Sequence, residues 1–211
     1  MAVQEQTIVQ ANGNKLMVAN QEIRVVAKLG EPLILVFDNV LGDEECDALI
    51  ALAQERTQRA KIGKSHTVSD IRTSSSMFFE ESENELIERI ETRVAELMNV
   101  PVTHAEPLQI LHYKPGEQYQ PHYDYFTSGN VVNNRISTLV MYLNDVEEGG
   151  ETYFPSIGFS VTPKKGSAVY FEYFYTDDRL NELTLHAGNP VAVGEKWVAT
   201  QWMRRQRHRY L

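Results

Sequence analysis

The stretch His122-Tyr123-Asp124 places an imidazole and a carboxylate two residues apart. Side chains two positions apart on an extended strand point to the same side, so His122 and Asp124 are expected to face a common point. His186 stands just before turn-forming residues 188–190 and is expected to end a different strand. Two histidines and one carboxylate can bind one face of a metal ion and leave its other positions open. The alternatives are that Asp124 caps a turn and that His122 is a surface imidazole.

The chain around these residues is built of short β-rich runs divided by glycine, proline, asparagine and aspartate. The expected strands are residues 108–113, 136–143, 168–173, 183–186, 190–193 and 197–203. Many short strands with such punctuation favour a sandwich or barrel over alternating strands and helices. The predicted fold class is therefore mainly β (α+β), with a double-stranded β-helix, or jelly-roll, core and supporting N-terminal helices packed on one sheet.

The first half of the chain is expected to supply one strand and two helices. The apolar run at residues 33–37 predicts a buried strand, and Asp43 is expected to open a helix. A second helix is expected to follow Ser82 as its N-cap, with Glu85 as the capping-box partner. Without repeats or linkers, residues 1–211 are predicted to form one catalytic domain, in which residues 1–104 support a core at 105–205 that carries the metal site. Residues 61–70 could close as a lid or could simply connect two elements.

Lys196 is the candidate for binding a negatively charged co-substrate beside the metal. In the strand expected after residue 195, residues 196, 198, 200 and 202 share one face. An inward lysine is costly unless it pairs with an anion, which the far carboxylate of a dicarboxylic co-substrate would provide. Tyr113 and Thr138 are candidates for hydroxyls that direct this charge. The alternatives are a lysine at the exposed entrance of the strand, and hydroxyls that only pack inside the barrel.

Composition and charge exclude several classes of function. The net charge is −9, and only residues 204–209 form a basic cluster, so nucleic acid is not expected as a partner. That cluster is interpreted as a solvated tail or as a surface that balances the acidic body, with docking of a partner as the alternative. Cys46 is the only cysteine and is expected to be a buried helical thiol. No apolar run is long enough for a membrane span or a signal peptide, so a cytoplasmic protein is expected. The acidic body and basic tail permit a homodimer without requiring one.

Four blocks of the sequence resemble the prolyl 4-hydroxylases, a family of dioxygenases that depend on Fe(II) and 2-oxoglutarate. The blocks are residues 113–124, 135–144, 149–155 and 186–197, which occur in the family's order and together cover roughly residues 105–205. The tripeptide Arg72-Thr73-Ser74 also resembles an upstream element of the family's substrate groove. Two histidines and one carboxylate, as in His122, Asp124 and His186, are the ligand set that non-haem Fe(II) oxygenases use.

The resemblance implies a set of catalytic residues and a reaction. His122, Asp124 and His186 would bind Fe(II), and Lys196 would pair with the C5 carboxylate of 2-oxoglutarate. The reaction implied is hydroxylation of peptidyl-proline at C4 in proline-rich or collagen-like peptides, with O2 as co-substrate, ascorbate as a further cofactor, and release of succinate and CO2.

The resemblance also implies which side chains line the peptide groove. They are Tyr119, Arg135, Trp202 and Arg72. Packing inside the barrel is the alternative for Tyr119 and Trp202, and a plain surface cation is the alternative for Arg135. A polyproline helix is preformed, so docking it in such a groove costs little order.

Compared with the collagen-modifying animal enzymes, the chain is expected to lack a separate peptide-binding domain, a disulfide pair and a secretory or retention signal. It resembles a stand-alone bacterial or algal-type catalytic domain instead. Two other functions remain open: a related oxygenase acting on a free amino acid or small molecule, and a non-catalytic jelly-roll module that binds a metal. A zinc hydrolase is disfavoured, because the sequence contains no His-Glu-x-x-His motif.

Overall fold

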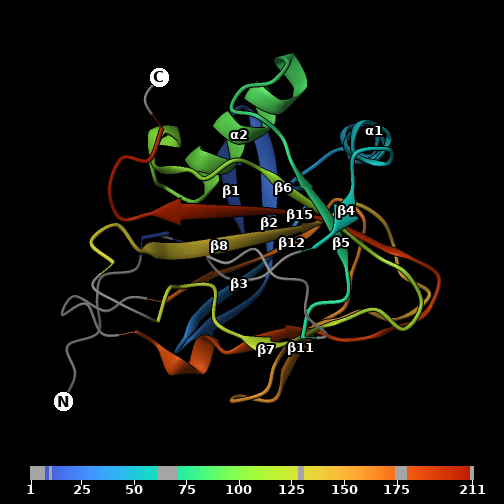
Figure 1. Ribbon diagram of the computed structural model, residues 1–211. Coiled ribbons are helices and arrows are strands. Elements are labelled where there is room, and N and C mark those ends of the chain that lie inside the picture. The colour runs from blue at the N-terminus through green and yellow to red at the C-terminus, as the bar shows by residue number, and fades with distance from the viewer. Residues whose placement is uncertain (1–7, 10, 61–70, 128–130, 174–179, 210–211) are drawn as a thin grey trace.

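The protein is layered, with two helices on one side of a large β-sheet and smaller sheets on the other side (Figure 1). The computed structural model describes residues 8–9, 11–60, 71–127, 131–173 and 180–209. Within them, the large sheet is antiparallel throughout. Its strand order is β1 (Lys15–Val18), β2 (Gln21–Gly30), β3 (Leu33–Asp38), β12 (Ala168–Glu172), β8 (Arg135–Tyr142), β15 (Lys196–Arg204), β6 (Gln109–Tyr113), β5 (Ser75–Phe78) and β4 (Gln58–Arg59).

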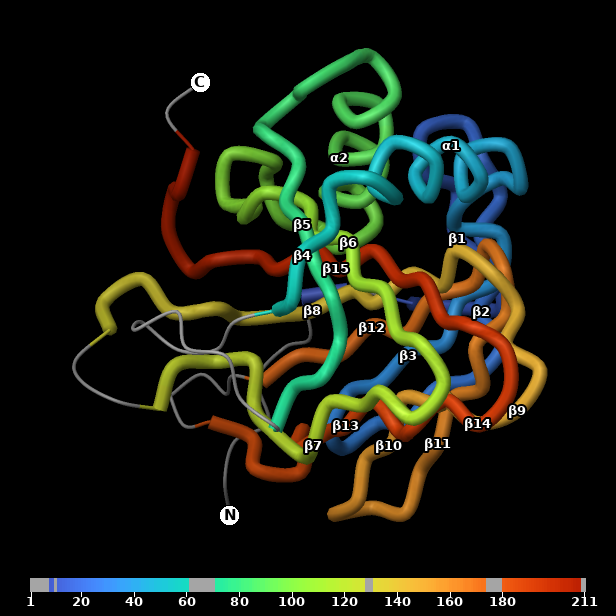
Figure 2. Tube along the Cα trace, turned by 45° about the vertical axis from the view of Figure 1, so that its right-hand side comes forward, coloured from blue at the N-terminus to red at the C-terminus, as the bar shows by residue number. Residues whose placement is uncertain are grey.

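The smaller sheets are grouped together below the large one in Figure 2. The first runs in the order β11 (Phe159–Val161), β10 (Thr152–Phe154), β13 (His186–Gly188) and β7 (Tyr119–His122), again antiparallel. The second pairs β14 (Val191–Val193) with β9 (Glu148–Gly149). The mainly β architecture predicted from the sequence is therefore present, and the first sheet carries two of the three expected metal ligands.

Two hydrophobic cores lie on the two faces of the large sheet. One core packs α1 (Asp43–Ala53) and α2 (Glu85–Leu97) against the sheet, and the other fills the space between the large sheet and the smaller sheets. Strand β15 serves both cores, because Trp197 and Ala199 face the helices whereas Val198 faces the smaller sheets. This alternation is the one expected for an extended strand.

The start of α2 differs from the prediction. Asn84 is the N-cap, and its side-chain oxygen accepts hydrogen bonds from the backbone N–H groups of Leu86 and Ile87 at 3.0 and 3.1 Å. Ser82 has a φ of 50°, which is not the extended conformation that an N-cap adopts, and its N–H donates to Glu91. The prediction of Ser82 as the cap is therefore wrong, because the asparagine next to the helix takes that role.

Two further predictions from the sequence need correction. Residues 182–184 form a short 3-10 helix (Glu182–Thr184), so the strand expected at 183–186 begins only at His186. The basic cluster is not simply a solvated tail, because Arg209 is fully buried and forms two hydrogen bonds with Glu91 of α2, at 2.6 and 2.7 Å. A buried glutamate on a helix requires such a partner, and arginine can satisfy both of its oxygens.

Some remaining predictions concern the helices and the proposed lid. Cys46 is a free, buried thiol on α1, as expected. None of the helices in the described part of the chain is long and apolar enough to cross a bilayer. The segment 61–70, proposed above as a lid, lies outside the described residues.

Candidate metal centre

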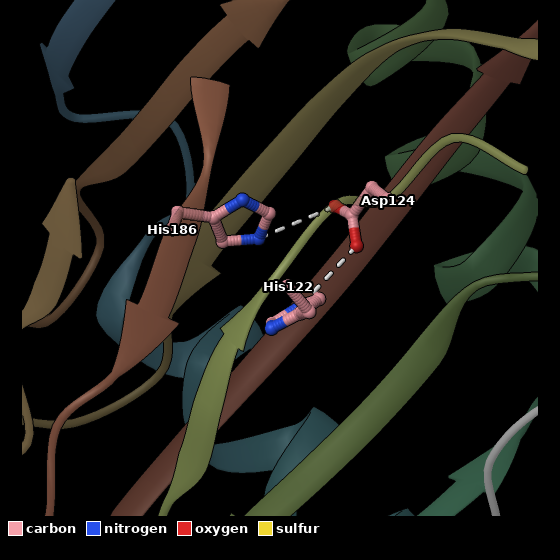
Figure 3. Close-up of side chains that lie close together, drawn as sticks. All are labelled: His122, Asp124 and His186. Atoms are coloured by element: carbon pink, nitrogen blue, oxygen red, sulfur yellow. Dashed lines mark ion pairs between the residues drawn. The ribbon is translucent and has the colours of Figure 1, made fainter. Parts of the chain in front are cut away.

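Three side chains from separate parts of the sequence converge on one point, as Figure 3 shows. The potential ligand atoms of His122, Asp124 and His186 all lie within 4.8 Å of one another. Nε2 of His122 is 3.5 Å from Oδ1 of Asp124, and Nε2 of His186 is 3.6 Å from Oδ2. No other group of three histidine, cysteine, aspartate or glutamate side chains is arranged in this way among the described residues.

Backbone carbonyls orient both imidazoles. Nδ1 of His122 lies 2.8 Å from the carbonyl oxygen of Gln120, and Nδ1 of His186 lies 3.0 Å from that of Thr184. Since a carbonyl oxygen can only accept, each Nδ1 carries the proton and donates it. The lone pair of each ring is then on Nε2, which faces Asp124. This is the orientation in which histidines bind metals in proteins.

Asp124 reaches the same point by a different route from the one predicted. Strand β7 ends at His122, so the two side chains do not lie on one continuous strand. Asp124 is held in the bend beyond the strand by two groups of β8. The hydroxyl of Thr138 donates to its Oδ2 at 2.7 Å, and Nη1 of Arg135 donates to its backbone carbonyl at 3.0 Å.

The electrostatic environment suits a divalent cation. Burial acts to raise the pKa of Asp124, but the neighbouring His186, His122 and Arg135 outweigh it and hold that pKa well below its usual range. Burial lowers the pKa of His186 to about 4. At neutral pH the carboxylate is therefore ionised and the His186 imidazole is neutral, which is the protonation state that metal binding requires. The three residues fit a metal on both geometry and charge.

Lys196 lies in the same cavity as the three potential ligands. Four alternate residues of β15 line that cavity: Lys196, Val198, Thr200 and Trp202. The predicted alternation of side chains along this strand is therefore confirmed. Only 3% of Lys196 is exposed, and its ammonium forms no hydrogen bond or ion pair with another described residue. Burial lowers its pKa to about 8, although the charge of Glu151 acts in the opposite direction. An anion entering the cavity would find an ammonium that is not paired with a carboxylate of the described residues.

The two hydroxyls predicted to assist Lys196 occupy different places. Tyr113 lines the cavity, and the Lys196 ammonium lies 5.1 Å from the centre of its ring. Thr138 points to Asp124 instead, so the structure does not place it beside Lys196. Two other threonines line the cavity, Thr200 of β15 and Thr152 of β10, and the hydroxyl of Thr152 accepts a hydrogen bond from Tyr142 at 2.7 Å. Thr152 stands in the third of the four sequence blocks, but no local pattern in that block indicated that it faces the cavity.

Three of the four predicted groove residues line the cavity: Tyr119, Arg72 and Trp202. Tyr119 stacks on His122 with ring centres 3.5 Å apart, and the Arg72 guanidinium lies 4.8 Å from the centre of the Tyr119 ring. Arg135 does not line the cavity. Its guanidinium is paired with Glu106 and lies 3.8 Å from the centre of the Trp202 ring.

Comparison with known proteins shows which family the chain belongs to. Residues 108–204 match the model of the 2OG-Fe(II) oxygenase superfamily. Two relatives from Arabidopsis thaliana, probable prolyl 4-hydroxylases 3 and 10, are 39% and 40% identical; each alignment covers 82% of this chain and 69% of the relative. Prolyl 4-hydroxylase 1 of the same plant is 38% identical, over 90% of this chain and 75% of its own length.

Solved structures of prolyl hydroxylases also resemble this chain. The viral collagen prolyl hydroxylase of Paramecium bursaria Chlorella virus-1, in complex with 2-oxoglutarate, is 34% identical with a TM-score of 0.68, covering 81% of this chain and 95% of that one. A prolyl-4-hydroxylase from Pseudomonas putida is 20% identical with a TM-score of 0.61, covering 82% and 92%, which supports the fold alone.

The fold and the family match define an oxygenase of the Fe(II)- and 2-oxoglutarate-dependent class. Within that class, the chain belongs to the prolyl 4-hydroxylase family. The predicted jelly-roll fold class and the predicted enzyme class are both confirmed.

Proposed function

We propose that this protein hydroxylates proline at C4 within proline-rich or collagen-like peptides, consuming 2-oxoglutarate and O2 and releasing succinate and CO2. The observation that carries this proposal is the presence, in one cavity, of the three convergent ligands and of a buried lysine without an anionic partner. The relatives named as prolyl 4-hydroxylases support prolyl substrates, and the viral collagen prolyl hydroxylase supports a peptide.

His122, Asp124 and His186 would hold the iron. Their two Nε2 atoms and one carboxylate provide three ligands on one side, which leaves further positions open to the co-substrate and to oxygen. When bound, Fe(II) supplies the activation of O2 that no protein side chain provides. The protein contributes the orientation of these three ligands, through the carbonyls of Gln120 and Thr184 and through Thr138.

Lys196 would bind the C5 carboxylate of 2-oxoglutarate. A lysine presents a compact charge without the planar fork of arginine, so neighbouring donors must set the direction of the bound carboxylate. Tyr113 and Thr152 line the same cavity and are the hydroxyls proposed for this role. Burial raises the pKa of Tyr113, which keeps its phenol protonated and able to donate. The cavity wall also contains the apolar side chains of Leu111, Val140 and Val198.

The peptide would dock over Tyr119, Arg72 and Trp202 at the cavity. Aromatic faces are suited to proline rings, and an extended polyproline segment loses little conformational freedom on binding. Arg135 acts indirectly in this proposal, since it contacts Asp124 and the Trp202 ring from outside the cavity lining.

Ascorbate, a cytoplasmic location and a homodimer are also proposed. Ascorbate would maintain iron in the ferrous state.

The cytoplasmic location is proposed because the cytoplasm is a reducing compartment. It is supported by the single cysteine, which is a buried free thiol on α1. Dimerisation is supported only by the contrast between the acidic body and the cluster at residues 204–209. Sedimentation at several protein concentrations would test it.

A comparison of substrates tests the function. The protein is incubated with Fe(II), 2-oxoglutarate and ascorbate, with either a proline-rich peptide library or free proline. The proposal predicts that peptides gain one oxygen atom at C4 of proline, with matching release of succinate. Oxidation of free proline alone would favour the small-molecule oxygenase. A protein that consumes no 2-oxoglutarate with any substrate would be the non-catalytic module.

A further inference from the structure

A chain of two buried hydroxyls ends on the Asp124 carboxylate. The hydroxyl of Thr138, in the middle of β8, donates to Oδ2 of Asp124 at 2.7 Å and is itself in contact with the hydroxyl of Tyr173. Thr138 is 0% exposed and Tyr173 is 1% exposed. Tyr173 directly follows β12, which pairs with β8, so the large sheet positions both hydroxyls.

The direction of donation along this chain is fixed. An ionised carboxylate can only accept, so the single hydroxyl proton of Thr138 must point to Asp124. The lone pairs of Thr138 are then left to accept from Tyr173. Burial raises the pKa of Tyr173 well above its usual value, so the phenol keeps its proton. Donation therefore runs from Tyr173 to Thr138 to Asp124.

We propose that Thr138 and Tyr173 are positioning residues that hold the Asp124 carboxylate in the orientation required for metal binding. The inference rests on the metal centre proposed above. Asp124 lies beyond the end of β7, so the strand itself does not fix its side chain. Arg135 holds only its backbone carbonyl. The Thr138 hydroxyl occupies Oδ2, and Oδ1, the oxygen nearer His122, is left as the ligand atom.

The first test removes the Thr138 hydroxyl and measures metal binding directly. Apo-protein of the wild type and of Thr138→Val is titrated with Co(II), and the visible absorption of the bound ion is followed. Loss of a group that orients a metal ligand weakens metal affinity by roughly 10- to 100-fold. The variant should show that weakening, together with a raised apparent KM for iron and a kcat largely retained at saturating iron. Thr138→Ser, which keeps the hydroxyl, should restore affinity to near the wild-type value.

The second test examines whether Tyr173 acts through Thr138. Tyr173→Phe should weaken Co(II) binding by less than Thr138→Val does, because the carboxylate keeps its direct donor. In the double variant the two losses should not add, since Tyr173 has no route to Asp124 once the Thr138 hydroxyl is gone. Full additivity would overturn the assigned role of Tyr173.

Matched controls come from the same two strands. Ser137→Ala on β8 and Tyr170→Phe on β12 each delete a buried hydroxyl that is not in contact with Asp124. Both should bind Co(II) as the wild type does. The inference is overturned if a folded Thr138→Val protein keeps wild-type affinity, or if the controls lose as much. A wild-type protein that binds no Co(II) would refute the metal centre itself, and that result is visible without any variant.

Discussion

His122 lies directly opposite His186 in the antiparallel pair of β7 and β13. The two rings are 4.4 Å apart between centres and inclined at 56°, although the residues are far apart in the sequence. Strand pairing therefore brings two of the three ligands together, and the third arrives on the bend after β7. Since cross-strand neighbours move together, a displacement of either strand would disturb both histidines.

Replacing a ligand should abolish turnover without unfolding the protein. His122→Ala or Asp124→Ala removes one of three protein ligands, so the loss of activity should exceed the roughly 100-fold that loss of a supporting group can cause. Oxygen consumption and succinate release measure the activity, and circular dichroism checks the fold. Substantial oxygen consumption by either folded variant would contradict the assigned metal centre.

Lys196→Met should weaken 2-oxoglutarate binding and stabilise the protein in the absence of ligands. Burial lowers the pKa of Lys196 from 10.5 to about 8, which corresponds to an unfavourable contribution to folding of about 3 kcal/mol at pH 7. Methionine fills a similar volume without a charge, so the free energy of unfolding in urea should rise by up to that amount. Lys114→Met replaces an exposed lysine and should change neither quantity.

The stability difference between wild type and Lys196→Met should depend on pH. Below about pH 8 both the folded and the unfolded wild type carry the ammonium, so its full burial cost is present. Between about pH 8 and 10.5 only the unfolded chain holds the proton, and wild-type stability therefore rises with pH. The gap between the two proteins should shrink across this window. A constant gap from pH 7 to pH 10 would show that Lys196 is not buried as a cation.

Binding of 2-oxoglutarate should weaken in alkaline solution. Above about pH 8 the ligand-free protein loses the Lys196 proton, so binding the anion requires proton uptake. The dissociation constant should be flat below that pH and should increase by about tenfold for each pH unit above it. Calorimetry in two buffers of different ionisation enthalpy, with a redox-inert divalent metal, would measure both effects. Equal affinity at pH 7 and pH 9.5 would exclude Lys196 as the anion partner.

Removing Arg209 should destabilise the protein far more than removing an exposed arginine. The Arg209 and Glu91 side chains are each 1% exposed or less, and loss of one partner from such a buried pair costs about 3–5 kcal/mol. Arg209→Ala should lower the free energy of unfolding by that amount. Arg56→Ala, which breaks an exposed pair with Glu83, should cost at most about 1 kcal/mol. Similar effects of the two changes would indicate that the C-terminal segment is not docked in solution.

The main site features could be predicted because they depend on local patterns. The alternation after residue 195 belongs to one short segment. The spacing of His122 and Asp124 is also local, although Asp124 lies in the bend beyond β7 and not on the same strand as predicted. The turn residues after His186 were interpreted wrongly, because His186 begins β13 instead of ending a strand. Side-chain alternation therefore identified the cavity face of β15 before its neighbours were known.

Other features could not be predicted, because they depend on which strands pair. Thr138 and Thr152 are both threonines in β-rich blocks, but only the pairing of β10 with β13 brings Thr152 to the cavity, opposite Gly188. The pairing of β8 with β12 brings Thr138 to Tyr173. The partner of Arg209 is on a helix more than a hundred residues earlier in the chain. No local pattern carries this information.

Strand β15 does not tolerate the insertion or deletion of a single residue. Its alternate residues face different surroundings, with Lys196 in the cavity and Trp197 in the core beneath the helices. Inserting or deleting one residue within the strand would exchange these two sets, bringing an ammonium against the helices and an indole into the cavity. Evolution can therefore vary this segment by substitution, whereas a single-codon insertion or deletion there would remove catalysis and folding together.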